Sequence, residues 1–170
     1  GMPSIYAISP DGESGSLSNG NEVIQPGDTL VFVSNSTDQF AQVTRGVGKS
    51  DPDLKERAQI AVFGASQFGM RLASYYLTRG HNVVVIEPDL DAANELVGST
   101  VGNSKRLDVI HGDPQDEELL KELGIDTHDI AVAALGDDNL NIAISMRAKD
   151  KGVQRTGLVL KDRALVEAVQ

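Results

Sequence analysis

The stretch "QIAVFGASQFG" (59–69) is the part of the sequence best suited to chemistry, because it reads as a buried strand, a glycine turn and the start of a helix. A dinucleotide-binding fingerprint has glycine at the first, third and sixth positions of such a turn, which here are Gly64, Ser66 and Gly69. The three glycines allow a sharp turn, close approach to a pyrophosphate, and tight packing of the helix on the strand. The helix start would then offer free N–H groups to phosphate oxygens.

The middle position of this turn departs from the fingerprint. Ser66 places a Cβ and a hydroxyl where the backbone would meet a pyrophosphate. Because serine is small and its hydroxyl can donate to a phosphate oxygen, the substitution weakens the predicted site without excluding it. The alternative is a turn retained only because the fold needs it, and the sequence leaves both interpretations open.

An acidic residue follows at the distance that a dinucleotide site requires. Glu87 lies 18 residues after Gly69, at the end of the next predicted strand. In such sites an acid about 20 residues after the turn holds the ribose hydroxyls. A solvated carboxylate at a strand end is the alternative, and the glycine turn upstream favours the ribose contact.

From residue 58 onward, short apolar runs alternate with helical patterns. We expect strands at 59–63, 82–86, 107–110, 129–134 and 156–160, and helices at 68–79, 89–97, 115–123, 139–151 and 162–169. Asp113 before Pro114 predicts a helix N-cap. Continuous apolar strands with repeated crossovers predict an α/β fold, a Rossmann-like doubly wound parallel sheet of about five strands.

The chain before residue 46 has a different character and reads as a small β-rich appendage. A strand is expected at 4–9, and two strands around a Pro-Gly-Asp turn at 22–34. Residues 36–44 can form one or two helical turns. The polar, glycine- and proline-containing stretch 46–57 is predicted to be a linker, which leaves 58–170 as the α/β domain.

Composition excludes several classes of protein and site. The chain has no cysteine, so disulfides, thiolate metal ligands and cysteine nucleophiles are absent. Its net charge is −10, with no cluster of lysine and arginine, so we expect no nucleic-acid partner. The longest apolar runs have the length of strands and fall short of the roughly 20 residues that span a membrane, so no direct membrane insertion is expected. The first residues also lack the basic and apolar segments of a signal peptide.

Catalytic and metal-binding groups are not expected. The histidines are His81, His111 and His128. A dehydrogenase needs a proton donor at the ligand, and of the three only His111 lies near the predicted ligand edge. His111 and Asp113 lack a third metal ligand, and helix capping accounts for Asp137 and Asp138.

Several motifs together resemble the TrkA-N domain, also called the RCK N-terminal domain, over residues 58–170. They are "HGD" after the third strand, "DEELLKELGI" in the next helix and "ALGDDNLNI" after the fourth strand, together with the glycine turn. The front part, "NEVIQPGDTLVFVSNSTDQFAQV", looks like the closing half of a TrkA-C (RCK C-terminal) domain, which would cover residues 1–45. The resemblance implies two such units in tandem.

The resemblance implies a cytosolic regulatory domain of a potassium channel or a Trk/Ktr-type potassium uptake system. Such domains bind NAD(H), ATP, ADP or AMP and assemble as homodimers or rings beneath a membrane potassium channel or transporter subunit. The protein would then be cytoplasmic and peripheral to the inner face of the cell membrane. Two alternatives remain: a degenerate RCK scaffold that assembles with an empty pocket, and an NAD(P)-dependent oxidoreductase, for which no catalytic group is visible.

The resemblance also implies a set of binding residues. They are the phosphate loop, the ribose-binding acid with its neighbour, and the segments after the third and fourth strands: Gly64, Ala65, Ser66, Gln67, Phe68, Gly69, Glu87, Pro88, Gly112, Asp113, Leu135 and Gly136. Ser66 replaces the middle glycine, and Gln67 stands where many members carry arginine. An amide is neutral whereas a guanidinium is charged, so the resemblance implies weaker ATP binding or a less charged ligand.

Overall fold

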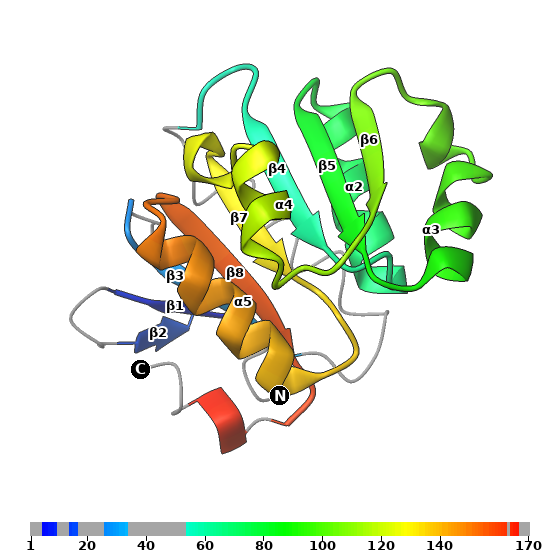
Figure 1. Ribbon diagram of the computed structural model, residues 1–170. Helices are drawn as coiled ribbons and strands as arrows, with labels where there is room; N and C mark the ends of the chain where they lie inside the picture. Colours follow the sequence, from blue (N-terminus) through cyan, green and yellow to red (C-terminus); the bar gives the residue numbers. More distant parts are fainter. Residues whose placement is uncertain (1–4, 10–13, 17–25, 34–53, 163, 167–170) are drawn as a thin grey trace.

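A single sheet of eight strands forms the centre of the protein, in the order β2-β1-β3-β8-β7-β4-β5-β6 (Figure 1). The computed structural model describes residues 5–9, 14–16, 26–33, 54–162 and 164–166. The strands are β1 Ile5–Ile8, β2 Ser14–Ser16, β3 Thr29–Val33, β4 Gln59–Phe63, β5 Asn82–Glu87, β6 Leu107–His111, β7 Ile130–Ala133 and β8 Arg155–Leu160. The helices are α2 Gln67–Thr78, α3 Leu90–Val97, α4 Glu117–Glu122 and α5 Asp138–Asp150, with 3-10 turns η2 Val101–Asn103, η3 Ile125–Thr127 and one at 164–166.

Six of these strands, from β3 to β6 in the sheet order, pair in parallel, and β1 and β2 continue the sheet in antiparallel pairing. The predicted Rossmann-like α/β fold is therefore confirmed. The five strands expected after residue 58 all lie within one residue of their predicted ends. Of the last predicted helix, at 162–169, the described residues show the single 3-10 turn at 164–166.

The sixth parallel strand comes from the N-terminal part of the chain. β3 pairs with β8 along its whole length, from Thr29 opposite Thr156 to Val33 opposite Leu160. Phe32 is 1% exposed, so β3 contributes to the same core as the rest of the sheet. The assignment of residues 1–45 to a TrkA-C-like module stays a prediction. The expected helix at 36–44 and most of the linker at 46–57 lie outside the described residues.

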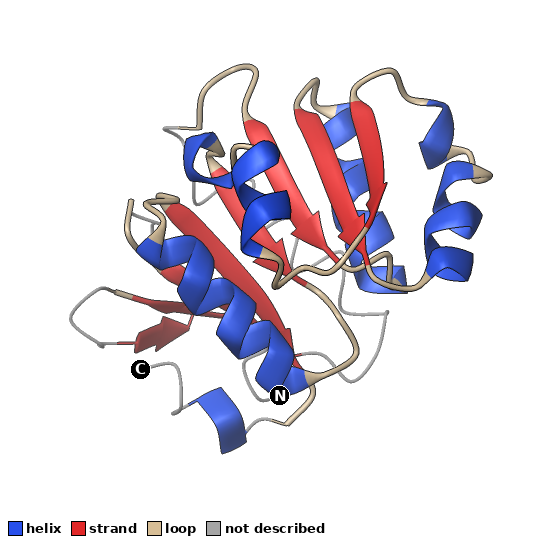
Figure 2. Cartoon of the chain, in the orientation of Figure 1, coloured by secondary structure: helices blue, strands red, loops and turns tan. Residues whose placement is uncertain are grey.

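Helices cover both faces of the sheet, with α4 and α5 in front of it and α2 behind it in Figure 2. Side chains alternate along each strand, so Ile60 and Val62 of β4 pack with α2 and α3, while Ala61 and Phe63 pack with α4 and α5. Burying a large apolar side chain stabilises the fold by about 1.5–3 kcal/mol. This double core explains why the strands read as continuous apolar runs.

The start of α4 differs from the prediction. Asp113 was expected to cap a helix beginning at 115, but its Oδ1 accepts the N–H of Gln115 in a turn that precedes the helix. Asp116 is the N-cap instead, and its Oδ1 accepts the N–H of Glu118 at 3.0 Å. Asp113 and Asp116 can each cap the start of a helix. The helix begins after Asp116, which places Leu120 against the core.

Candidate functional site

The carboxyl ends of β4 and β7 form the point at which the sheet topology reverses direction. β4 lies between β5 and β7, and the chain leaves β4 for α2 on one face and leaves β7 for α5 on the other. In open α/β sheets ligands bind in the crevice at this position. All twelve residues predicted for the site follow or begin at strand ends on this edge, so the fold brings them together.

Packing alone accounts for both glycines of the turn after β4. Gly64 has φ +113°, and a Cβ there would lie 2.6 Å from the carbonyl oxygen of Ala134. A Cβ on Gly69 would collide with the carbonyl oxygen of Gly64. Any larger residue at either position would force backbone atoms apart. The fold therefore needs these glycines whether or not a nucleotide binds.

The hydroxyl of Ser66 is committed to the protein itself. It donates to the carbonyl oxygen of Ala134 at 2.6 Å and accepts the N–H of Gly69 at 3.1 Å, as the N-cap of α2. A serine hydroxyl has one proton, so in this conformation it cannot also donate to a phosphate, as the sequence suggested. The contact also uses one of the N–H groups that the helix start would offer to an anion.

Glu87 lies beside this turn with its carboxylate buried. The residue is 6% exposed, Oε1 accepts the N–H of Ala65 at 2.8 Å, and Oε2 accepts the N–H of Asp89 at 2.8 Å. Within the described part of the chain no cationic side chain pairs with it. Each oxygen retains a second lone pair that can accept a hydroxyl proton. The alternative of a freely solvated strand-end carboxylate is therefore wrong.

The ends of β5 and β6 are joined by one main-chain hydrogen bond and one hydrogen bond from a side chain to a main-chain carbonyl. The N–H of Gly112 donates to the carbonyl oxygen of Glu87 at 3.1 Å. His111 Nε2 lies 3.1 Å from the carbonyl oxygen of Pro88, and because a carbonyl only accepts, this nitrogen is the donor. These contacts hold the predicted adenine-side segment, Gly112 and Asp113, next to Glu87.

Asn141 positions the segment after β7, although it is not among the residues predicted for the site. Its side chain is completely buried, and Oδ1 accepts the N–H of Leu135 at 2.9 Å. Its Nδ2 donates to the carbonyl oxygens of Leu135 at 3.0 Å and Val159 at 2.9 Å. The available signal was an asparagine one turn into a helix on the face that also carries Ile144 and Ala148.

Among the described residues of the turns directly after β4, β5, β6, β7 and β8, Lys161 is the one cationic side chain. Its Nζ donates to the carbonyl oxygen of Gly136 at 3.0 Å, and Asp138 accepts its main-chain N–H at 2.9 Å. Aspartates predominate in the same turns: Asp89, Asp113, Asp116, Asp137 and Asp162. Gln67, which stands where the resemblance implies an arginine, is exposed and neutral. The charge of this edge disfavours a strongly anionic ligand.

The histidines serve the fold in the described structure. His81 is buried, and its Nδ1 accepts the N–H of Ala58 at 3.0 Å. Burial lowers the pKa of His81, and the charges of Arg57 and Arg79 lower it further against an opposing effect of Asp129. The described residues contain no group of three or more histidine or acidic side chains arranged to hold a metal. No helix among them is both long and apolar enough to cross a bilayer.

Comparison with protein families gives a match over most of the α/β part. Residues 60–167 match the family model described as the TrkA-N domain. The Trk system potassium uptake protein TrkA of Halomonas elongata is 29% identical over 157 residues, which are 91% of this chain and 32% of the relative. A Mycobacterium tuberculosis protein of the same name is 34% identical over 94 residues, 54% of this chain and 39% of that protein.

Among solved structures, the crystal structure of the GsuK RCK domain is similar with a TM-score of 0.56. It is 23% identical and the match covers 69% of this chain and 24% of that chain, a similarity that concerns the fold alone. The chain spans about a third of the length of the curated relatives it matches.

Proposed function

Because the chain belongs to the TrkA-N domain family, we propose that it is a cytoplasmic, nucleotide-sensing regulatory domain of a potassium uptake system or channel. The observation that carries the proposal is the carboxylate of Glu87. It is buried, held by two main-chain N–H groups and still able to accept hydroxyl protons at the edge where α/β sheets bind ligands. The names of the relatives supply the potassium system.

The proposed ligand is an adenosine-type nucleotide of low charge, NAD(H) or AMP in preference to ADP or ATP. Glu87 would accept the ribose hydroxyls, and Gly112 and Asp113 would border the adenine. The turn from Gly64 to Gly69 would face the phosphates, with Lys161 on the opposite side. In the described part of these turns one lysine stands among several aspartates, and repulsion from the aspartates disfavours a triphosphate more than a ligand with one or two phosphate charges.

The two halves of the site fit such a ligand unequally. The ribose half is already in a suitable arrangement, because the carboxylate of Glu87 is fixed. In the phosphate half, a pyrophosphate would compete with the bonds of Ser66 to Ala134 and Gly69. Binding would therefore separate the turn from the end of β7, and a ligand shifts such an equilibrium through its differential affinity for the two states. A homodimer or ring of these domains would transmit the change to a membrane partner.

A second candidate function is an RCK scaffold that assembles without a nucleotide. The observation that favours it is that the Ser66 hydroxyl makes its hydrogen bonds to Ala134 and Gly69 of the protein itself, so the turn needs no ligand to complete them. No comparable observation favours the oxidoreductase, because each histidine bonds to a main-chain group: His81 to Ala58, His111 to Pro88 and His128 to Gly124.

Thermal unfolding with NADH, AMP, ADP and ATP tests the proposal. A ligand at 100 times its dissociation constant adds about 2.7 kcal/mol to the free energy of unfolding. We expect stabilisation by NADH or AMP that is lost in Glu87→Gln and retained in Glu95→Gln, which makes the same change at an exposed position on α3. Circular dichroism checks that both variants fold. No stabilisation by any nucleotide at millimolar concentration would support the scaffold, and consumption of NADH with simple carbonyls would support an enzyme.

A further inference from the structure

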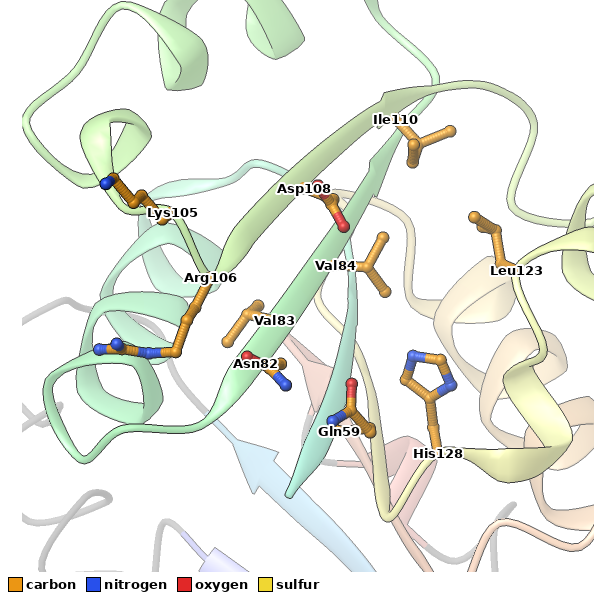
Figure 3. Close-up of a pocket in the computed structure, with 10 residues that line it drawn as sticks. All are labelled: Gln59, Asn82, Val83, Val84, Lys105, Arg106, Asp108, Ile110, Leu123 and His128. Carbon is orange, nitrogen blue, oxygen red and sulfur yellow. The ribbon is translucent and has the colours of Figure 1, made fainter. Parts of the chain in front are cut away.

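A cavity of about 300 Å³ lies on the sheet away from the nucleotide edge (Figure 3). It opens over the amino-terminal part of β5 and over β6, on the face that carries α4 and α5, beside the segment from α4 to η3. Its lining residues are Gln59, Asn82, Val83, Val84, Lys105, Arg106, Asp108, Ile110, Leu123 and His128. Ligand pockets begin at about this volume, so the cavity is large enough for a small metabolite.

The floor and one wall of the cavity are apolar. Val84 is opposite Asp108 in the pairing of β5 with β6, and Ile110 follows two residues later on the same face. Leu123 reaches toward them from the end of α4, as Figure 3 shows. Val84 is 8% exposed, and Ile110 and Leu123 are half-buried. These three side chains form a surface that an aliphatic chain can cover.

Two hydrogen-bond acceptors face this apolar surface from different sides. The carboxylate of Asp108 and the ring of His128 both point into the cavity in Figure 3. His128 Nδ1 lies 2.9 Å from the carbonyl oxygen of Gly124, and since a carbonyl only accepts, Nδ1 carries the proton. In the neutral ring, Nε2 therefore presents a lone pair. The side-chain amides of Gln59 and Asn82 border the same space and can donate or accept.

The cationic lining residues do not neutralise Asp108. Arg106 turns toward α2, where its Nη2 donates to the carbonyl oxygen of Leu77 at 3.0 Å. Lys105 also points away from the cavity in Figure 3. In the described part of the chain no ion pair involves Asp108. The exposed carboxylate of Asp108 therefore remains an unpaired negative charge beside the apolar surface of Val84, Ile110 and Leu123.

From this arrangement we propose that the cavity binds a small aliphatic cation, an alkylamine or alkylguanidine. Its charged group donates to the carboxylate of Asp108 and to Nε2 of His128, and its alkyl chain lies on Val84, Ile110 and Leu123. A metal ion is a poorer occupant, because two protein ligands are too few for a closed site. The proposal does not depend on nucleotide binding, since none of the residues that line the cavity is among the residues predicted for the nucleotide site.

Titration of the ¹⁵N-labelled protein with n-butylguanidinium, followed by amide chemical shifts, tests the proposal. We expect saturable shifts at Val84, Ile110 and Leu123 with a millimolar dissociation constant, and at least tenfold weaker binding of n-butanol, which keeps the alkyl chain and lacks the charge. Shifts spread over the acidic surface without saturation, or equal binding of the alcohol, would overturn the proposal.

The matched variants are Asp108→Asn and Asp91→Asn. Both side chains are exposed and both changes remove one negative charge, but Asp91 lies on α3, away from the cavity. A charge-assisted hydrogen bond contributes enough for its loss to weaken binding of n-butylguanidinium about tenfold in Asp108→Asn. Asp91→Asn should bind it as the unmodified protein does. Equal affinity in all three proteins would overturn the assignment of Asp108.

Discussion

The two halves of the carboxyl edge differ in what their polar groups leave available to a ligand. Glu87 is fixed by two N–H groups and keeps acceptor capacity on both oxygens. The hydroxyl of Ser66 donates its one hydrogen bond to the carbonyl oxygen of Ala134 and accepts the N–H of Gly69. Both residues belong to the same motif, yet one is prepared for a ligand and the other completes a local network. Residue type and spacing locate a site, while hydrogen-bond partners decide whether it is open.

Replacement of Gly64 should destabilise the protein most, and it tests whether the fold needs this glycine in the absence of a ligand. Gly64→Ala combines a strained positive φ with a contact to the carbonyl oxygen of Ala134, so we expect the free energy of unfolding to fall by about 4 kcal/mol. Urea denaturation without nucleotide measures it. Gly98→Ala is the control, because its Cβ would make an ordinary 3.5 Å contact. Similar stability of the two variants would contradict the packing explanation.

Asn141 supports the segment after β7, and its replacement should have the second largest effect on stability. Asn141→Ala leaves the main-chain groups of Leu135 and Val159 without their partner, and should lower the free energy of unfolding by about 2–3 kcal/mol. Asn139→Ala removes an exposed amide from the same helix and should change stability by less than about 0.5 kcal/mol. Chemical denaturation of both variants provides the measurement.

A smaller effect tests the phosphate half directly. Ser66→Gly loses the hydrogen bond to Ala134 and the helix cap, with an expected cost of about 1 kcal/mol, and frees the N–H of Gly69 for a phosphate. Calorimetry with NADH or AMP should then show higher affinity. Ser99→Gly removes a similar hydroxyl bridge, from Leu96 to Gly102, away from the edge and should leave affinity unchanged. If Ser66→Gly, like Ser99→Gly, shows no gain in affinity for NADH or AMP, the result would favour the scaffold without a nucleotide.

The smallest expected effect concerns pH and lies at the opposite end of the strands. The pKa of His81 is lowered in the folded protein by burial and by Arg57 and Arg79, so protonation favours the unfolded chain. Its contribution to stability is complete above the unfolded pKa of about 6.5 and is lost as the pH falls below that value. His81→Asn can keep the bond from the N–H of Ala58 and should unfold with less pH dependence between pH 7.5 and 5.5.

The sequence predicted the fold well because each strand is buried on both faces. "QIAVF" gave β4 with the observed bounds, since a continuous apolar run between turns has few other uses in an α/β chain. The place of β3 was not predictable. "TLVFV" indicates a buried strand, but nothing in it specifies β8 as the neighbour. Pairing partners depend on contacts between residues far apart in the sequence, and local patterns do not encode them.

For the site, the sequence located the edge but not the bonds within it. A serine at position 66 and a glutamate at position 87 are both compatible with ligand contact. Only the three-dimensional structure reveals that the hydroxyl of Ser66 already donates to another residue, while the carboxylate of Glu87 can still accept. Asn141 was missed for a related reason. An asparagine near a helix start is usually solvated or a cap, and its burial follows from the packing of α5 on β8.

The pairing of β3 with β8 has a consequence for any shortened form of the protein. A chain trimmed to the family match, starting at residue 60, would lose β3 and turn β8 into the outer strand of the sheet. Its unpaired N–H and C=O groups would be bared next to Leu158 and Leu160, both fully buried in the intact arrangement. We expect such a fragment to self-associate through the exposed edge of β8. An oligomer formed in this way would result from the loss of β3 and would not represent a native interface.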